Sequence, residues 1–174
     1  MDLSYPIGKP ELPASMDAAQ WRELVAQIAQ APQSFRTAVE GLSDAQLDTV
    51  YRPGGWTVRQ VIHHVADSHM NAYIRFRLAL TEDNPTIKPY NEKTWAELPD
   101  ARSCPVEVSL ELVEAMHKRW VALLESIPES DFGRTFVHPE RGPMRLDTTL
   151  ALYAWHGRHH SAHITGLVKR MGWK

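Results

Sequence analysis

The chain has 174 residues, of which 43% are hydrophobic, and its formal charge is −2. That amount of apolar sequence supports one sizeable core, so we expect a single globular domain over 1–174. The basic and acidic residues are mixed along the chain without a basic run, which argues against nucleic acid as a partner. Because Cys104 is the single cysteine, neither an intramolecular disulfide nor a cysteine-rich zinc cluster can form.

The N-terminal part predicts an extended arm and a cytoplasmic protein. Residues 1–13 contain three prolines, so we expect 1–15 to form an extended arm ahead of the first helix. These residues also lack the basic start and apolar core of a signal peptide. No apolar stretch approaches the roughly 18 residues that a membrane span needs. The sequence therefore predicts a location in the cytoplasm and no contact with a membrane.

The first half of the chain predicts two long helices and a short one between them. Apolar residues from Asp17 to Gly41 recur with helical spacing, and we expect this helix to bend or restart near Pro32. A short helix is predicted over 44–47, capped by Ser43. After a linker with Pro53 and two glycines, the next helix is predicted from Val58 to about Thr81, capped by Thr57.

The second half predicts two more long helices. Residues 84–105 contain four prolines and read as a long connection, after which a helix is predicted over Val106–Ile127. A loop or small hairpin is expected over 132–146, followed by a last helix over Asp147–Met171. A connection of this length can cross a bundle and let the second and third long helices run in the same direction. The predicted fold is therefore all-α, a four-helix bundle with one long crossover connection.

Histidines are concentrated in two of these helices. Four of the nine lie within 156–163, on an arc that shares its direction with apolar residues and so faces inward. This arc offers two pairs at i and i+4 spacing, His156 with His160 and His159 with His163, and periodicity does not choose between them. Neutral imidazole is a common ligand of transition metals, and catalytic zinc takes three protein ligands. The pattern predicts a metal site between two helices.

The helix that begins at Val58 holds the candidates for the third ligand. His69 shares the direction of the apolar stripe, which predicts the deeper position for it, whereas His64 lies on a polar seam. His63 is the third histidine of this helix. Spacing alone leaves the third ligand undecided.

Three stretches of sequence resemble a known family. Residues 54–70, with Tyr73 to Phe76 after them, look like the second helix of the DinB-like metalloprotein superfamily. Together with the N-terminal residues 3–8 and the ending 159–165, they are similar to the YfiT group of metal-dependent hydrolases. The resemblance covers essentially the whole chain.

The resemblance implies a bundle that binds one divalent metal ion per chain, usually zinc, with nickel also plausible. The helix-two ligand falls eight residues after Trp56, on His64, and the paired ligands fall on His159 and His163. His63, His156 and His160 then become neighbours of the site, and His69 a buried structural histidine. Members of the group are taken to be cytoplasmic homodimers. This chain departs from the pattern at Gly157, where glycine inside a helix costs roughly 1 kcal/mol relative to alanine.

Three functions are compatible with such a site. The first is a metal-dependent hydrolase acting on a small molecule, with Asp67 as the nearest carboxylate in sequence, either as general base or orienting a ligand. The zincin peptidase mechanism is not supported, because no glutamate follows His159. The second is a transferase of a low-molecular-weight thiol such as bacillithiol or mycothiol, whose acidic groups would need a cation such as Arg59, Arg75 or Arg158. The third is a metal-binding module without catalysis.

Overall fold

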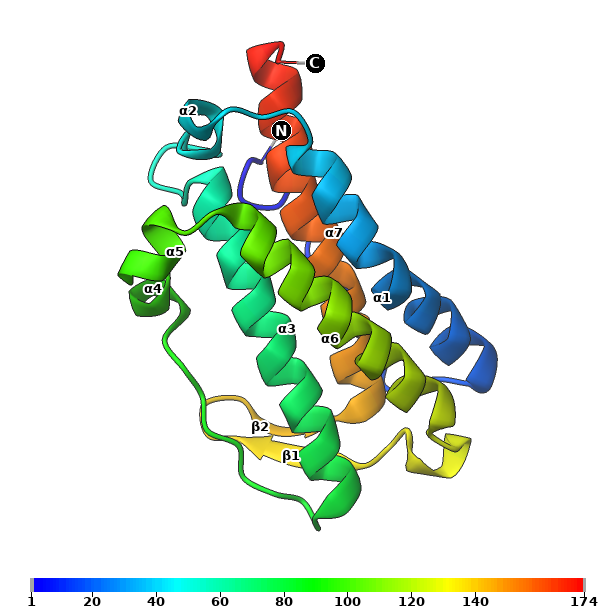
Figure 1. Cartoon of the computed structure of the whole chain (residues 1–174). Helices are drawn as coiled ribbons and strands as arrows, with labels where there is room; N and C mark the ends of the chain where they lie inside the picture. Colours follow the sequence, from blue (N-terminus) through cyan, green and yellow to red (C-terminus); the bar gives the residue numbers. More distant parts are fainter. Residues whose placement is uncertain (1, 174) are drawn as a thin grey trace.

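A computed structural model describes residues 2–173, so Met1 of the predicted arm and Lys174 lie outside the described residues. The four long helices are α1 (Ala18–Val39), α3 (Val58–Thr81), α6 (Val106–Ser126) and α7 (Leu146–Met171). In Figure 1, α3 and α6 run in one direction, and α1 and α7 run in the opposite direction. Helix α1 contacts α6 and α7, and α3 contacts the same two helices. The predicted four-helix bundle is confirmed, with the second and third long helices parallel.

Local capping chemistry explains where the helices begin and end. Asp17, Ser43 and Thr57 each start a helix with a capping box, in which the glutamine three residues later bonds back to the cap. The middle one caps the short helix α2 (Asp44–Leu47). At the other end of the chain, Gly172 terminates α7 with a φ of 66°, a left-handed conformation that glycine adopts without a steric penalty.

Two expectations about the elements need correction. Helix α1 passes through Pro32 as one continuous helix rather than restarting there. The connection over 84–105 contains two short helices, α4 (Glu92–Trp95) and α5 (Pro99–Ser103). Asn91 caps α4 through the backbone N–H groups of the following turn, and proline in the first turn of α5 leaves no helical bond unmade. Such single turns are too short to leave a periodic apolar pattern.

The connection over 132–146, for which a loop or a small hairpin was predicted, is a small hairpin. A short 3₁₀ turn, η1 (Glu129–Asp131), leads into strands β1 (Thr135–His138) and β2 (Gly142–Arg145), which pair in antiparallel fashion. The isoleucine at position 87 in the crossover donates a backbone hydrogen bond to Val137. The hairpin therefore closes the end of the bundle at which α3 ends and α7 begins (Figure 1).

The bundle interior has two apolar clusters with a polar layer between them. On α3 the first cluster ends at Ala66 and the second begins at Ala72, and on α7 the clusters leave residues 155–163 between them. The same gap occurs on α6 between Val113 and Trp120. Six histidines fill these gaps: His69, His117, His156, His159, His160 and His163. A middle layer of imidazoles is thus enclosed by apolar side chains above and below.

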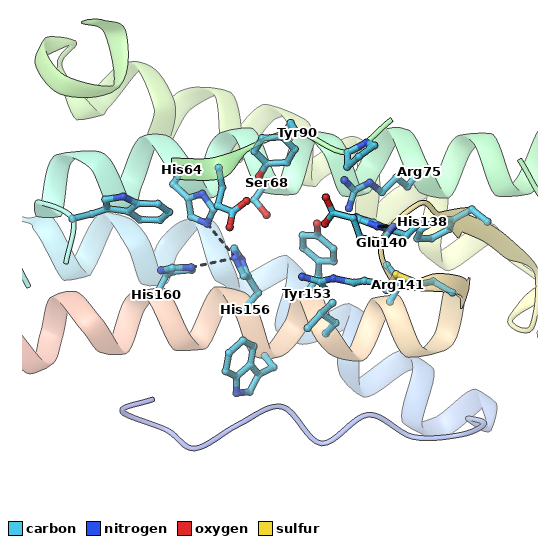
Figure 2. A pocket seen from close by; sticks show the side chains of 18 residues that line it. His64, Ser68, Arg75, Tyr90, His138, Glu140, Arg141, Tyr153, His156 and His160 are labelled. Carbon is cyan, nitrogen blue, oxygen red and sulfur yellow. Dashed lines mark hydrogen bonds between the residues drawn. The ribbon is translucent and has the colours of Figure 1, made fainter. Parts of the chain in front are cut away.

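The N-terminal arm covers α7 on the side away from α3 (Figure 2). The indole nitrogen of Trp155 donates a hydrogen bond to the carbonyl of Gly8 at 3.2 Å, and Thr148 donates one to Pro13 at 3.2 Å. The arm is therefore part of the domain rather than a loose extension.

Among the described residues, no helix is long and apolar enough to cross a bilayer.

Candidate metal centre

Three histidines from two helices converge at the middle layer. The Nε2 atom of His156 lies 3.3 Å from Nε2 of His64 and 3.1 Å from Nε2 of His160. Possible ligand atoms of all three lie within 4.8 Å of one another. Figure 2 shows these rings pointing toward one point, His64 from α3 and the other two from adjacent turns of α7.

This spacing fits a divalent metal ion. Zinc–nitrogen bonds of about 2.05 Å in a tetrahedral site place their nitrogens about 3.3 Å apart. The two printed separations around His156 agree with that value. The Nδ1 atom of His160 is buried without a hydrogen-bond partner in the described part of the chain. Three imidazoles form a donor set that suits zinc or nickel.

Burial keeps these ligands in the form that binds a metal. It lowers the pKa of His64 to about 4, and it lowers the pKa values of His156 and His160 well below the usual range, with the neighbouring histidines adding to the effect. A group with such a pKa is neutral at pH 7 and keeps a lone pair for a cation. The three residues are therefore neutral at pH 7 and could hold a metal ion.

The ligand set implied by the resemblance differs from the one that the structure assembles. His64 is common to both, but His159 and His163 are turned away from it. The ring of His159 stacks on Trp155 at 4.2 Å, and that of His163 stacks on Tyr51 at 4.0 Å. Among residues 2–173, these two histidines join no group of three possible ligands.

The difference arises from how α7 is rolled about its axis. Successive residues turn by about 100°, so His159 is displaced by about 60° from His156 around the helix. This rotation directs His156 and His160 toward α3 and directs the other pair toward the N-terminal arm, where Tyr5 lies 5.8 Å from His159. Both residues of the second pair are buried, as is His160, whereas His156 is half-buried, so burial does not single out the first pair.

Two other predicted residues have different surroundings. His63 lies away from the three ligands, where its Nε2–H donates to the carbonyl of Cys104 at 3.0 Å and its Nδ1 lies 2.7 Å from Ser109. Asp67 is half-buried, and burial with the nearby charge of Asp100 raises its pKa to about 6. Asp67 is not among the residues that line the cavity beside the three ligands. Its role as a general base stays a prediction.

A cavity of about 390 Å³ opens beside the three histidines. Figure 2 shows His64, His156 and His160 at one end, and Arg75, His138, Glu140 and Arg141 at the other end. Tyr153 and Tyr90 lie between the two ends (Figure 2). Burial raises the pKa of Tyr90 to about 12, so its phenol stays protonated. The cavity has room for a small molecule with polar groups.

Only one of the three arginines proposed for a thiol lines this cavity. Arg59 is buried elsewhere, where it forms ion pairs with Asp48 at 2.7 Å and with Asp44 at 2.9 Å. Arg158 is exposed and borders a groove between α1 and α7. Arg75 is half-buried, lines the cavity and forms no ion pair with any described residue. Arg75 is therefore the candidate that the structure leaves available.

Sequence reasoning missed His117, although a signal for it was present. His117 falls on the buried stripe of α6, four residues after Val113 and three before Trp120. A histidine in the middle of an apolar stripe predicts a buried partner. The structure supplies one, because His117 lies 2.9 Å from His69.

With the bundle and its histidine layer established, comparison with known proteins identifies the family. The sequence matches the DinB superfamily over residues 27–164. The chain belongs to the DinB superfamily. This DinB-superfamily chain is 55% identical over 172 residues to a protein of Bacillus cereus strain 03BB102 named "Putative metal-dependent hydrolase", covering 99% of both. A Bacillus anthracis protein of the same name is 54% identical over 172 residues, again covering 99% of both.

Solved structures agree with the family assignment. The chain superimposes on YfiT from Bacillus subtilis with a TM-score of 0.97 and 48% identity, over 100% of both chains. That protein is described as a probable metal-dependent hydrolase with an unusual four-helix bundle topology. A second structure, the four-helix bundle protein TT2238, has a TM-score of 0.55 and 20% identity, over 88% of this chain and 99% of the other. The latter likeness concerns the fold alone.

Proposed function

We propose that this DinB-superfamily protein is a metal-dependent hydrolase of a small molecule, with His64, His156 and His160 as its metal ligands. The convergence of their three ligand atoms within 4.8 Å carries the proposal. The names of its relatives, at 54% and 55% identity, support it. Zinc is the expected ion, one per chain, and nickel is the alternative, since three neutral imidazoles suit both.

Different side chains around the cavity can bind the metal ion, donate hydrogen bonds to the substrate and hold an anionic group. His64, His156 and His160 would hold a divalent ion, which would supply the Lewis acidity to activate water or polarise a carbonyl. Tyr90 and Tyr153 can donate hydrogen bonds to a bound substrate, because both line the cavity and the phenol of Tyr90 stays protonated. At the far end, Arg75 can hold a carboxylate or another anionic group of the substrate.

The general base is best sought among the carboxylates that line the cavity. Glu92 and Glu140 both do so, whereas Asp67 does not. A general base must come within hydrogen-bond reach of the proton it accepts. We therefore expect Glu92→Gln or Glu140→Gln to lower turnover by about 100-fold or more, and Asp67→Asn to have a smaller effect.

Thiol transfer is the second candidate, and Arg75 is the observation that favours it. A thiol held as thiolate at the metal would extend into the same cavity, and Arg75 would meet an acidic group of that thiol. Hydrolysis and thiol transfer thus share the site but differ in the co-substrate. A metal-binding module without catalysis is the third possibility.

Turnover assays separate these functions. Zinc-loaded and nickel-loaded protein would be incubated with ester and amide substrates, and separately with monochlorobimane and a panel of small thiols. Thiol-independent hydrolysis that disappears with chelator and in His160→Ala supports the hydrolase. Thiol-dependent conjugation with the same metal dependence would instead support the transferase. Metal binding without turnover in either assay would support the non-catalytic module.

We also propose that the protein is a cytoplasmic homodimer, as the resemblance implies. Trp95 is 38% exposed and rests against Tyr90, so it is available at a surface, whereas Trp173 contacts one of the apolar clusters. Light scattering on the purified protein tests the dimer, which requires twice the monomer mass of 19.8 kDa.

A further inference from the structure

A chain of hydrogen bonds links the ligand His156 to the backbone on the far side of the bundle. Nδ1 of His156 lies 3.1 Å from Nε2 of His69, and Nδ1 of His69 lies 2.9 Å from Nε2 of His117. Nδ1 of His117 lies 2.8 Å from the carbonyl oxygen of Ile28. We propose that His69 and His117 are positioning residues, which fix the tautomer of His156 so that its Nε2 lone pair faces the metal position.

The carbonyl of Ile28 is free to anchor this chain because of Pro32. In a helix the N–H of a residue bonds to the carbonyl four residues earlier, and proline has no N–H. Pro32 lies four residues after Ile28 inside the continuous helix α1, so the carbonyl of Ile28 lacks its helical donor. His117 supplies the donor instead. The proline at which the sequence predicted a bend or restart thus leaves a hydrogen-bond acceptor, the carbonyl of Ile28, free in the core.

The direction of every hydrogen bond follows from this anchor. A carbonyl oxygen only accepts, so Nδ1 of His117 carries the hydrogen. A neutral imidazole has one N–H, so Nε2 of His117 accepts, and Nδ1 of His69 must donate to it. By the same reasoning, Nε2 of His69 accepts from Nδ1 of His156. Nε2 of His156 is then left with a lone pair, and this is the atom nearest to His64 and His160.

The argument requires neutral rings, and the surroundings provide them. His69 is 0% exposed and His117 is 1% exposed. Burial lowers the pKa of His117 to about 4. Among residues 2–173, neither ring has a hydrogen bond to a carboxylate that would favour a charge. Burying an uncompensated imidazolium is costly, so both rings are neutral at pH 7.

Aromatic contacts hold the middle ring of the chain in place. His69 stacks on His117 with an angle of 14° between their planes. Trp120 and Tyr153 meet His69 nearly edge-on, at 88° and 89°. These contacts oppose a 180° flip of the ring, which would put carbon atoms where its two nitrogens now lie. The chain therefore specifies both the tautomer and the orientation of His156.

Histidine ligands commonly donate their second N–H to a carboxylate, a carbonyl or water, which fixes the tautomer. Here the carbonyl is reached through two further imidazoles. No such bond is present at Nδ1 of His160, as far as residues 2–173 show. His156 is thus the ligand with a fixed lone pair, and we expect it to anchor the ion. This inference rests on the proposed metal site, but the tautomers exist before any metal binds.

Imidazole nitrogen NMR shifts of the isotope-labelled, metal-free protein test the tautomers directly. We expect a hydrogen on Nδ1 in His69, His117 and His156, and on Nε2 in His63, whose Nε2–H faces the carbonyl of Cys104. A hydrogen on Nε2 of His156 in this protein would overturn the proposal. The measurement does not depend on metal or on activity.

Three variants then connect the tautomer to metal affinity. His117→Leu removes the acceptor for His69, and we expect zinc and nickel affinity to fall by about 10 to 100-fold, the usual effect of losing such support. His117→Gln restores an amide oxygen that can accept from His69, so it should recover a large part of the affinity. His63→Leu is the matched control, because it removes a buried histidine with two hydrogen bonds outside the chain.

Competition with a chromogenic chelator measures these affinities with zinc or nickel ions alone. Affinity in His117→Leu within twofold of the His63→Leu control would contradict the positioning role. If the wild-type protein has the expected tautomers but binds neither ion, the proposed function fails while the hydrogen-bond chain stands. If the variant does not fold, the NMR result on the wild-type protein still decides the direction of the chain.

Discussion

The Nε2 atoms of His156 and His160, one turn apart on α7, lie 3.1 Å from each other. Side chains four residues apart on a helix face the same direction, so two imidazoles can serve one ion only if that direction leads to a third ligand. His64 supplies the third imidazole of this group from α3. The identical spacing of His159 and His163 leads instead to Trp155 and Tyr51.

Alanine substitutions along α7 should separate the two pairs. We expect His156→Ala and His160→Ala to weaken zinc binding by more than about 100-fold, since even indirect support is worth about 10 to 100-fold. His159→Ala and His163→Ala should retain one ion per chain. Metal analysis after dialysis measures this. If the His159 and His163 variants lost the metal while the His156 and His160 variants kept it, the ligand set implied by the resemblance would be correct.

The metal-free protein should lose stability as the pH falls from about 6.5 to about 4. Burial lowers the pKa of His117 to about 4 in the folded chain, against an ordinary value of 6.5. As the pH falls, His117 therefore binds a proton in the unfolded chain at a higher pH than in the folded chain. This difference favours unfolding throughout the window. His117 alone contributes a slope of about 1.4 kcal/mol per pH unit.

Urea unfolding in chelator at pH 7 and pH 5 measures this slope. The His117→Gln variant cannot titrate at this position, so its free energy of unfolding should depend less on pH, by roughly one bound proton. Equal slopes in the two proteins would show that folding does not lower the pKa of His117.

Arg59 and Arg75 should have opposite roles. Arg59→Met removes two ion pairs and a hydrogen bond to the carbonyl of Cys104, so we expect a loss of about 2 kcal/mol in stability. Turnover per folded molecule should be unchanged. Arg75→Met should leave stability within about 0.5 kcal/mol and raise KM for an anionic substrate.

Thermal unfolding and steady-state kinetics on both arginine variants check this pair of predictions. An unchanged KM for Arg75→Met with substrates that carry a carboxylate would remove Arg75 as the anion-binding group. A rise in KM for Arg59→Met would contradict the purely structural role of Arg59.

Gly157 should tolerate alanine but not a larger side chain. A Cβ at this position would lie 3.4 Å from Cβ of Ala31 on α1 and 3.7 Å from Cε1 of His69. In Gly157→Ala, the added methyl group makes ordinary van der Waals contacts, so we expect a gain of about 1 kcal/mol from helix propensity. Gly157→Val adds atoms between α1 and α7, and overfilling of a core costs about 1 to 3 kcal/mol. Calorimetry on both variants tests this, and an equally stable valine variant would contradict the close approach.

The sequence by itself determined the four long helices and, to within about two residues, where they start and stop. Caps such as Asp17 and Thr57 act within one turn, and proline and glycine act on their own backbone, so these effects need no tertiary context. The inward histidine arc of 156–163 followed from the helical period. The resemblance of the chain to a family covered its whole length, and the comparisons confirmed it.

Only the tertiary structure decided which histidines meet. The helical period fixes the angle between His156 and His159 on one helix, but the roll of α7 against α3 depends on every contact along the bundle. The hydrogen bonds from His156 through His69 and His117 to Ile28 join four different helices. Contacts so distant in sequence leave no local pattern, because they form only when the helices have taken their places around the layer.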